Sequence, residues 1–205
     1  MSRRAVCVLV AVAALGAMAD ARQQEVSARD AGLYVVQADA SVARLVPQTV
    51  DVAMKGMGTS MATMGFTRPS AEARLFGARA EARLPAGKTT FHLQLNPPIA
   101  AGNPTAFSMM AGSDIPLQVR RPDDIALVRL TVASDSNERV ADLGRIGGTS
   151  PRNKVDLNTA RIDERGFRLE TRAPLVAGEY AFTVLPVTGG SGVGSEFWAF
   201  GIDPQ

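Results

Sequence analysis

Apolar and polar residues alternate along several short segments of the chain, which is typical of β-strands with one buried face. In the segment 89–96, Phe91, Leu93 and Leu95 alternate with His92 and Gln94. Further strand candidates lie between prolines, glycines and polar turns, at 33–36, 50–54, 125–133, 139–143, 160–171, 180–184 and 196–202. Short strands with this spacing and punctuation predict an all-β fold, an antiparallel immunoglobulin-like β-sandwich.

The alanine-rich segment 70–84 has the composition of a helix but the order of strands, because alanine leads the helix scale while the pattern has a period of two. Up to Leu75 the apolar residues stand at odd positions, and beyond Gly77 they stand at even positions. A helix would mix these two sets around its surface. The segment is therefore predicted to form two strands joined by a bulge or kink at Gly77.

The first 21 residues have the pattern of a secretory signal peptide. Arg3 and Arg4 precede an apolar run of 11 residues at 5–15, and small residues at 17–21 offer cleavage sites. The run is too short for a membrane span, although a retained membrane anchor stays the alternative. We expect a signal helix at 1–21, a lead-in at 22–48 and a sandwich domain at 49–205, in a bacterial protein that is periplasmic or secreted.

Composition limits the chemistry of the exported chain. The full chain has 22 basic and 20 acidic residues, and a cut before Asp20 removes Arg3 and Arg4 and makes the two numbers equal. No basic footprint for nucleic acid is left. The single cysteine, Cys7, lies in the leader, so the exported chain is expected to lack disulfides, thiolate metal sites and cysteine nucleophiles. No later segment is long and apolar enough to predict a membrane span.

The segment 174–182, with the sequence PLVAGEYAF, has the pattern of a tyrosine corner. In this motif a tyrosine hydroxyl binds a backbone group a few residues upstream. Leu175 precedes the turn, Gly178 supplies a permissive backbone, and Tyr180 follows two residues later. We expect all three residues to be structural, and Tyr180 not to be catalytic.

The ending PLVAGEYAFTVLP…EFWAFGID resembles the C-terminal half of certain secreted bacterial proteins of unknown function. The resemblance covers residues 115–203 and rests on a G-E-Y-A-F strand, a glycine-rich loop and a final F-G-I-D strand. It implies a β-sandwich, and no active site comes with it.

Four methionines, at Met54, Met57, Met61 and Met64, are spaced as on one face of a helix. Thioethers suit Cu(I), so a copper site is one hypothesis. Gly56 and its neighbouring glycines disfavour a helix, and no histidine or cysteine lies nearby. Packing in the core or a loop is the favoured interpretation, with flexible apolar contact with a partner as the second and copper as the third.

Other candidate chemistry in the sequence is weaker. His92 is the only histidine and is expected to face solvent from a strand. Ser191 lies in a glycine-rich segment, 189–194, that lacks the nucleophile-elbow pattern and the lysine of a phosphate loop. Acidic pairs at 123–124 and 163–164 are interpreted as solvated charges.

Trp198 and the two phenylalanines beside it cluster in the last strand, where core closure is the expected role. If Trp198 were exposed beside the glycine-rich loop, it would be the best candidate contact for a partner protein or glycan. The sequence thus favours an exported, non-catalytic binding or envelope-associated structural module without a cofactor. The alternatives are an exported hydrolase whose site is not located and, third, methionine-based copper binding.

Overall fold

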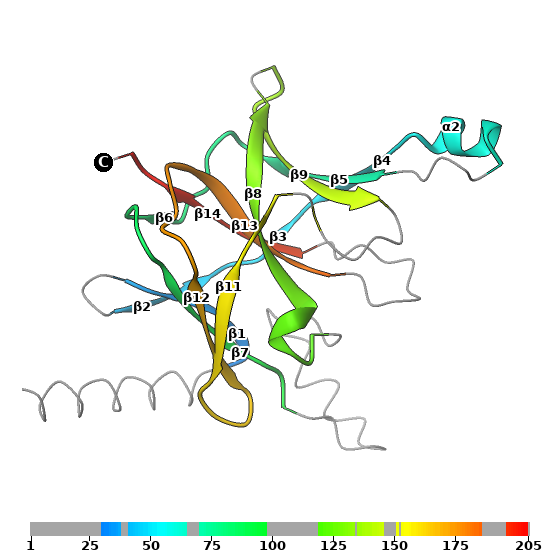
Figure 1. Cartoon of the computed structure of the whole chain (residues 1–205). Coiled ribbons are helices and arrows are strands. Elements are labelled where there is room, and N and C mark those ends of the chain that lie inside the picture. Colours follow the sequence, from blue (N-terminus) through cyan, green and yellow to red (C-terminus); the bar gives the residue numbers. More distant parts are fainter. Residues whose placement is uncertain are drawn as a thin grey trace, which may run out of the picture.

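The structure is a computed structural model that describes residues 30–37, 41–64, 70–97, 119–133, 135–145, 151, 153–185 and 196–204. The described part of the chain is built from β-strands in two sheets (Figure 1). The predicted signal helix at 1–21, part of the lead-in and the glycine-rich segment around Ser191 lie outside the described residues.

The smaller sheet has five antiparallel strands. Its order is β11 (Leu157–Arg161), β12 (Gly166–Thr171), β7 (Thr90–Gln94), β1 (Gly32–Val36) and β2 (Val42–Leu45). The larger sheet has the order β3 (Gln48–Thr49), β14 (Glu196–Ile202), β13 (Gly178–Val184), β8 (Ile125–Ala133), β9 (Glu138–Arg145), β5 (Ser70–Phe76) and β4 (Asp51–Lys55). Two short strands add to it, β10 (Lys154–Val155) on β8 and β6 (Arg83–Leu84), which pairs in parallel with β14.

The main hydrophobic core lies between the smaller sheet and the strands β8, β13 and β14. Phe91 of β7 meets Phe182 edge to face and also contacts Phe200, and Tyr180 stacks on Phe200. These residues alternate with inward-facing aliphatic residues, as the period-two pattern predicted. The all-β prediction and the two-sheet, sandwich-like layering are therefore confirmed.

A second core lies on the other face of β13 and β14, because the larger sheet curls back on itself. The two ends of this sheet, β3 and β4, are separated in the chain by Val50 alone. Strand β8 pairs with β13 along its first part and with β9 along its last part. The enclosed side chains are mostly small, with Ala73, Ala141, Ala181 and Ala199 among them. Alanines here let the curled walls approach closely at interior packing density.

The prediction for residues 70–84 is confirmed in its first half and wrong in its second. Ala71, Ala73 and Leu75 are buried in β5, and the chain kinks at Gly77, where φ is 84°. Beyond the kink only β6 is a strand. The intervening backbone follows an irregular path, and the Ala80 N–H donates to the Glu179 carboxylate instead of to a strand.

The polar face of β7 is less exposed than the alternation suggested. Gln94 is buried and His92 is half-buried. The reason is that β7 lies inside the smaller sheet, where His92 is in register with Tyr34 of β1 and Arg168 of β12.

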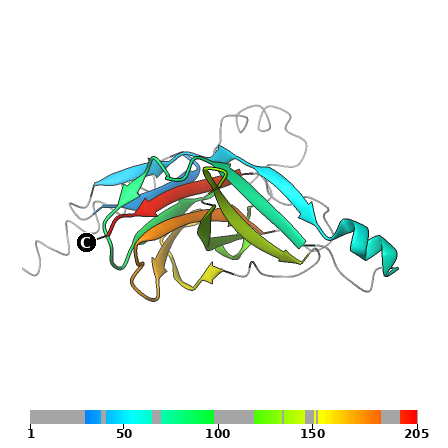
Figure 2. The same ribbon diagram turned by 90° about the horizontal axis from the view of Figure 1, so that it is seen from above.

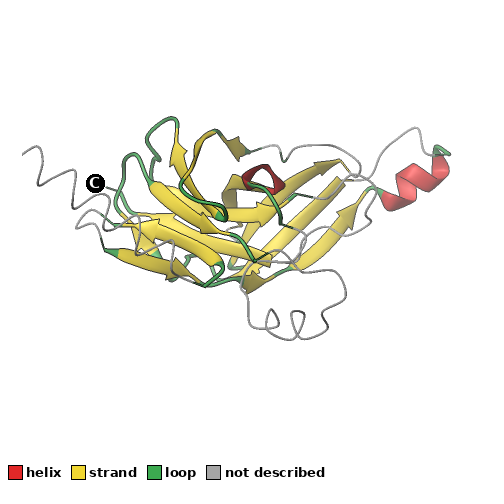
Figure 3. Cartoon of the chain, turned by 90° about the horizontal axis from the view of Figure 1, so that it is seen from below, coloured by secondary structure: helices red, strands yellow, loops and turns green. Residues whose placement is uncertain are grey.

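The chain after β4 forms an arm, defined here as the short helix α2 (Met57–Ala62) with the turn that ends at Met64. The helix projects from the body beyond the ends of the two sheets (Figures 1 and 2). The expectation that glycines prevent a helix here is wrong. Gly56 takes the left-handed conformation at the N-cap and so starts the helix, although no side chain caps it. The only other helical element described is the 3₁₀ turn η1 (Pro122–Asp124). Strands make up the rest of the regular structure (Figure 3).

Within the described part of the chain, none of the helices is both long and apolar enough to cross a membrane.

Candidate functional site

The start of β13 has the hydrogen bond expected of a tyrosine corner. The buried Tyr180 hydroxyl donates to the Val176 carbonyl, four residues upstream, at 3.0 Å. Gly178 has φ 154°, and a Cβ at this position would lie 3.3 Å from the guanidinium of Arg129. Leu175 is buried and exchanges two backbone hydrogen bonds with Gly87. The corner therefore fixes the loop that enters β13.

Replacement of Tyr180 by phenylalanine should lower the free energy of unfolding by about 1 kcal/mol, the usual net value of one hydrogen bond. The ring and its stacking on Phe200 are retained, so the fold should not change. Urea unfolding followed by tryptophan fluorescence measures this difference. A loss indistinguishable from zero would show that the hydroxyl bond does not stabilise the corner.

A cluster of charged side chains lies beside this corner, and Glu179 is at its centre. The Glu179 carboxylate contacts Arg83 at 2.5 Å and lies 3.8 Å from Nη1 of Arg139. Arg139 is 1 % exposed, and its other nitrogens donate to the backbone carbonyls of Phe76 and Gly77 and to Gln48. Buried charges need partners of this kind, because desolvation is costly.

The cluster continues to the surface through Asp203. Arg83 donates to the Asp203 carboxylate through Nε and Nη2, at 3.2 and 2.7 Å, and Arg79 adds a contact at 3.0 Å. The hydrogen bond from Arg83 holds the pKa of Asp203 below its ordinary value, and the same bond raises the pKa of Arg83. Burial lowers the pKa of Arg139 from its ordinary value, since the interior disfavours its charge.

The lowered pKa of Asp203 predicts a pH-dependent contribution to stability. A carboxylate whose pKa is depressed by folding stabilises the protein above its unfolded pKa, which is about 3.9, and loses this effect as pH falls further. Wild type should therefore exceed Asp203→Asn in melting temperature at pH 6, and the difference should shrink below about pH 4. Thermal melts of both proteins between pH 2.5 and 7 measure it. A difference that grows on acidification would contradict the ion pair.

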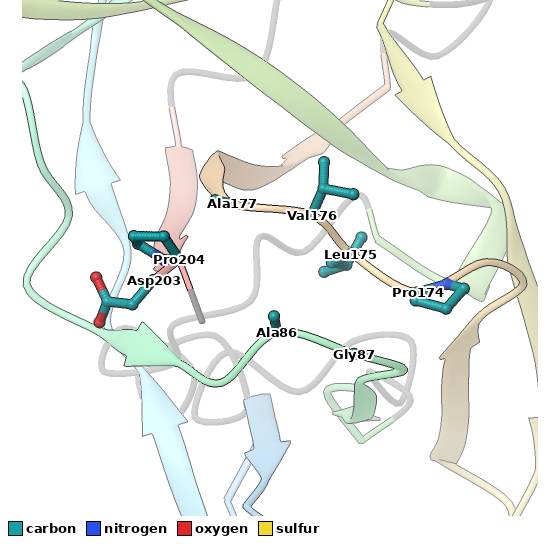
Figure 4. Close-up of a pocket in the computed structure, with 8 residues that line it drawn as sticks. All are labelled: Ala86, Gly87, Pro174, Leu175, Val176, Ala177, Asp203 and Pro204. Carbon is teal, nitrogen blue, oxygen red and sulfur yellow. The ribbon is translucent and has the colours of Figure 1, made fainter.

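A pocket of about 520 Å³ opens next to the charged cluster (Figure 4). Its walls come from the turn after β6, from the loop that enters β13 and from the end of β14. The lining residues are small or apolar with one exception, the carboxylate of Asp203, and they are Ala86, Gly87, Pro174, Leu175, Val176, Ala177, Asp203 and Pro204. Asp203 forms ion pairs with Arg83 and Arg79. The pocket therefore presents an apolar surface to a ligand, and its one carboxylate has no second acid or base beside it in the lining.

Three methionines in and beside the arm are exposed rather than packed in a core. Met54 is half exposed, while Met61 and Met64 are 79 % and 93 % exposed. Packing in the core is therefore wrong for these three, whereas packing in a loop stays a prediction. Met61 and Met64 belong to the arm, whose helix lies beyond the sheets, and Met54 lies in the end strand of the larger sheet (Figure 2). Met54 lies in β4, Met57 and Met61 in α2, and Met64 beyond the helix, so the four do not share one helical face. The copper hypothesis stays a prediction.

Trp198 is completely buried in the main core, where it lies opposite Phe182 in the β13–β14 pairing. The condition for a partner or glycan contact, exposure of Trp198, is therefore not met, and its burial agrees with the expected role in core closure. Its face of β14 is covered by the smaller sheet, and the alternation Trp198, Phe200, Ile202 places all three inside.

Other candidate residues are not brought together. The acidic pair at 123–124 lies in η1, where Asp124 accepts from the backbone N–H groups of Arg120 and Arg121. Asp163 likewise closes a turn by accepting from Arg165 and Gly166. Among the residues that the structure describes, no group of three histidine, cysteine, aspartate or glutamate residues could hold a metal ion.

Arg139 and Glu179 were not among the residues predicted from the sequence. A weak signal was available for both, because Arg139 shares the inward phase of β9 with Ala141, and Glu179 shares a face of β13 with Ala181. A charged residue in an apolar phase signals either a strand end or a buried ion pair. The sequence alone does not show which of the two applies.

No protein-family model matches the chain, and the searches of curated proteins and of solved structures likewise find no match. The resemblance of residues 115–203 to secreted bacterial proteins stays a prediction.

Proposed function

We propose that the protein is an exported, non-catalytic binding module that attaches to a partner protein in the bacterial envelope through the arm. In this proposal residues 1–21 form a signal helix that is cleaved, and the remainder is an immunoglobulin-like sandwich in the periplasm or outside the cell. The observation that carries the proposal is the exposure of Met61 and Met64 on the arm, whose helix projects from the body (Figures 1 and 2). Met54 is exposed beside the arm, in the end strand β4.

Methionine suits a contact surface because its side chain is flexible and polarisable and adapts to irregular apolar partners. An isolated helix of six residues is not stable in water, since helix nucleation is costly. The arm therefore gains order when a partner covers it. No charged residue occurs between Gly56 and Met64, so the partner surface should be apolar and the binding insensitive to salt.

The backbone of Met64 adds an independent argument. Its φ is 48°, in the left-handed region that a non-glycine residue occupies at a cost of roughly 1–2 kcal/mol. Its side chain is 93 % exposed, so packing against the body does not offset this cost. The conformation also ends the helix, since Met64 follows the C-cap residue Thr63 and its N–H donates to the Met61 carbonyl. We take the presence of methionine here, where glycine is usual, as support for a contact role of its side chain.

Replacement of Met64 by asparagine, which tolerates the left-handed region, should leave stability unchanged or raise it by up to about 1 kcal/mol. Partner binding should nevertheless weaken, because the thioether is lost. Thermal melts and the cross-linking assay below measure the two effects. A variant that loses stability and keeps full binding would assign Met64 to the fold instead.

The experiment for the proposed function is site-specific photo-cross-linking in cells. A photoreactive amino acid replaces Met61 in the arm or, as a matched control, the exposed Thr159 of the edge strand β11. The proposal expects one discrete cross-linked protein from position 61 and none from position 159. The cross-link should persist in 0.5 M salt, where the electrostatic screening length is on the order of 3–5 Å, because salt does not weaken an apolar contact. Equal labelling from both positions, or none from either, would contradict it.

A further inference from the structure

The pocket beside the tyrosine corner is held open by bonds on three sides. Gly87 and Leu175 exchange backbone hydrogen bonds at 3.2 and 2.8 Å, which join the two loops that form the walls. The Tyr180 hydroxyl holds the carbonyl of Val176, and two arginines hold Asp203 at the third side. The pocket has a volume of about 520 Å³ and is a shallow hollow that is open to solvent, so a ligand would lie along its surface and not be enclosed.

The surface that a ligand would meet is apolar. The exposed residues Pro174, Val176 and Pro204 contribute aliphatic walls, and Val176 is more than half exposed. Gly87 has open space around its Cα, since a Cβ added there would meet no atom within 4 Å. A chain of methylene groups could therefore lie across the outer side of the two joined loops and remove the exposed walls from water.

The charges around the pocket are positive in balance. The single acid in the lining, Asp203, is neutralised by Arg83 and Arg79. Arg129 lies at the Ala177 end, where Nη2 donates to the Ala177 carbonyl at 3.2 Å, and it has no acidic partner among the described residues. Lys88 follows Gly87 directly, is exposed, and also lacks an acidic partner in the described part of the chain.

We propose that this pocket binds an amphiphilic carboxylate, a single-chain molecule of the fatty-acid class, with its chain on the aliphatic walls and its carboxylate at Arg129. The guanidinium uses one of its donors for Ala177, and the remaining donors match the two oxygens of a carboxylate. Lys88, which follows the lining residue Gly87 in the chain, adds a second positive charge near the pocket. The pocket lies among the turn after β6, the loop into β13 and the end of β14, whereas the arm follows β4, so this site is independent of the proposed partner contact.

The test is calorimetric titration of the purified protein with decanoate below its micelle concentration. Decyltrimethylammonium, with the same chain and the opposite charge, is the ligand control. We expect decanoate to bind with micromolar to low millimolar affinity and decyltrimethylammonium at least tenfold more weakly. Equal binding of the two, or no binding of decanoate, would overturn the proposal.

Two variants locate the site. Arg129→Gln removes the carboxylate partner and should weaken decanoate binding at least fivefold. Val176→Asp places a negative charge on the wall and should abolish binding, while the exposed side chain makes a change in melting temperature small. Arg120→Gln is the matched control, because Arg120 is exposed near Asp124, and the adjoining Ile125 pairs with Val184 at the far end of β13 from the pocket. Equal affinity in wild type and both pocket variants would overturn the assignment.

Discussion

Replacement of Glu179 by glutamine should destabilise the protein by about 3 kcal/mol or more, because it leaves a buried arginine without a compensating charge. Arg139 is almost inaccessible to solvent, and the carboxylate of Glu179 is the acidic group that faces it, 3.8 Å away. Glutamine keeps the size and one acceptor oxygen, so the backbone N–H of Ala80 can still be bound. The loss therefore reports the charge and not the shape. Urea unfolding at pH 7 measures it.

Glu170→Gln is the matched control for this prediction. Glu170 pairs with Arg168 on the surface, where both side chains are nearly half exposed, and such pairs contribute about 0–1 kcal/mol. The double replacement Glu179→Gln with Arg139→Met should recover part of the loss, since an apolar side chain needs no partner. If Glu179→Gln costs no more than Glu170→Gln, the cluster does not stabilise the curled sheet.

Replacement of Trp198 by alanine should cost about 3–5 kcal/mol, as for other large aromatic residues that are fully buried. Trp198 lies in the main core between β14 and the smaller sheet, and its removal leaves a cavity lined by residues of both sheets. The variant is expected to unfold at much lower urea concentration or to be insoluble at 37 °C. Urea unfolding followed by circular dichroism measures the change, because the fluorescence probe is lost.

The control for this prediction is Phe76→Ala. Phe76 ends strand β5 and is 87 % exposed, so loss of its ring should change stability by less than about 0.5 kcal/mol. Comparable losses from the two variants would mean that Trp198 is not in the core, and its role as a partner contact would have to be considered again.

The strands were predictable because their signal is local. The segments 125–133 and 196–202 match β8 and β14 in extent. The kink at Gly77 was predicted because the apolar residues change from odd to even positions there. The turn of the β8–β9 hairpin is likewise local, since Asn137 takes the left-handed conformation that asparagine tolerates.

The curl of the larger sheet could not be predicted, because it depends on pairings between distant segments. The chain on either side of Val50 joins β14 on one side and β5 on the other, and nothing in the local pattern specifies these partners. The buried Arg139 and Glu179 were missed for the same reason. Their inward phase is visible in the sequence, but their pairing follows only from the fold.

In the arm a local rule gave a wrong prediction, because the glycines were expected to prevent a helix and α2 forms nevertheless. Glycine is unfavourable inside a helix, yet Gly58 lies within α2, and Gly56 precedes the helix in a left-handed conformation that glycine adopts readily. The exposure of Met61 could not be read from the sequence, since methionine is common in cores and on contact surfaces alike.

The central claim is that the arm contacts a partner, and methionine oxidation footprinting in intact cells tests it most directly. Sulfoxide formation follows exposure, so Met61 and Met64 should oxidise rapidly in the purified protein. In the native envelope both should be protected at least fivefold, while a control methionine introduced at the exposed position Thr159 should oxidise at the same rate in both settings. Equal oxidation of Met61 and Met64 in cells and in the purified protein would contradict the claim.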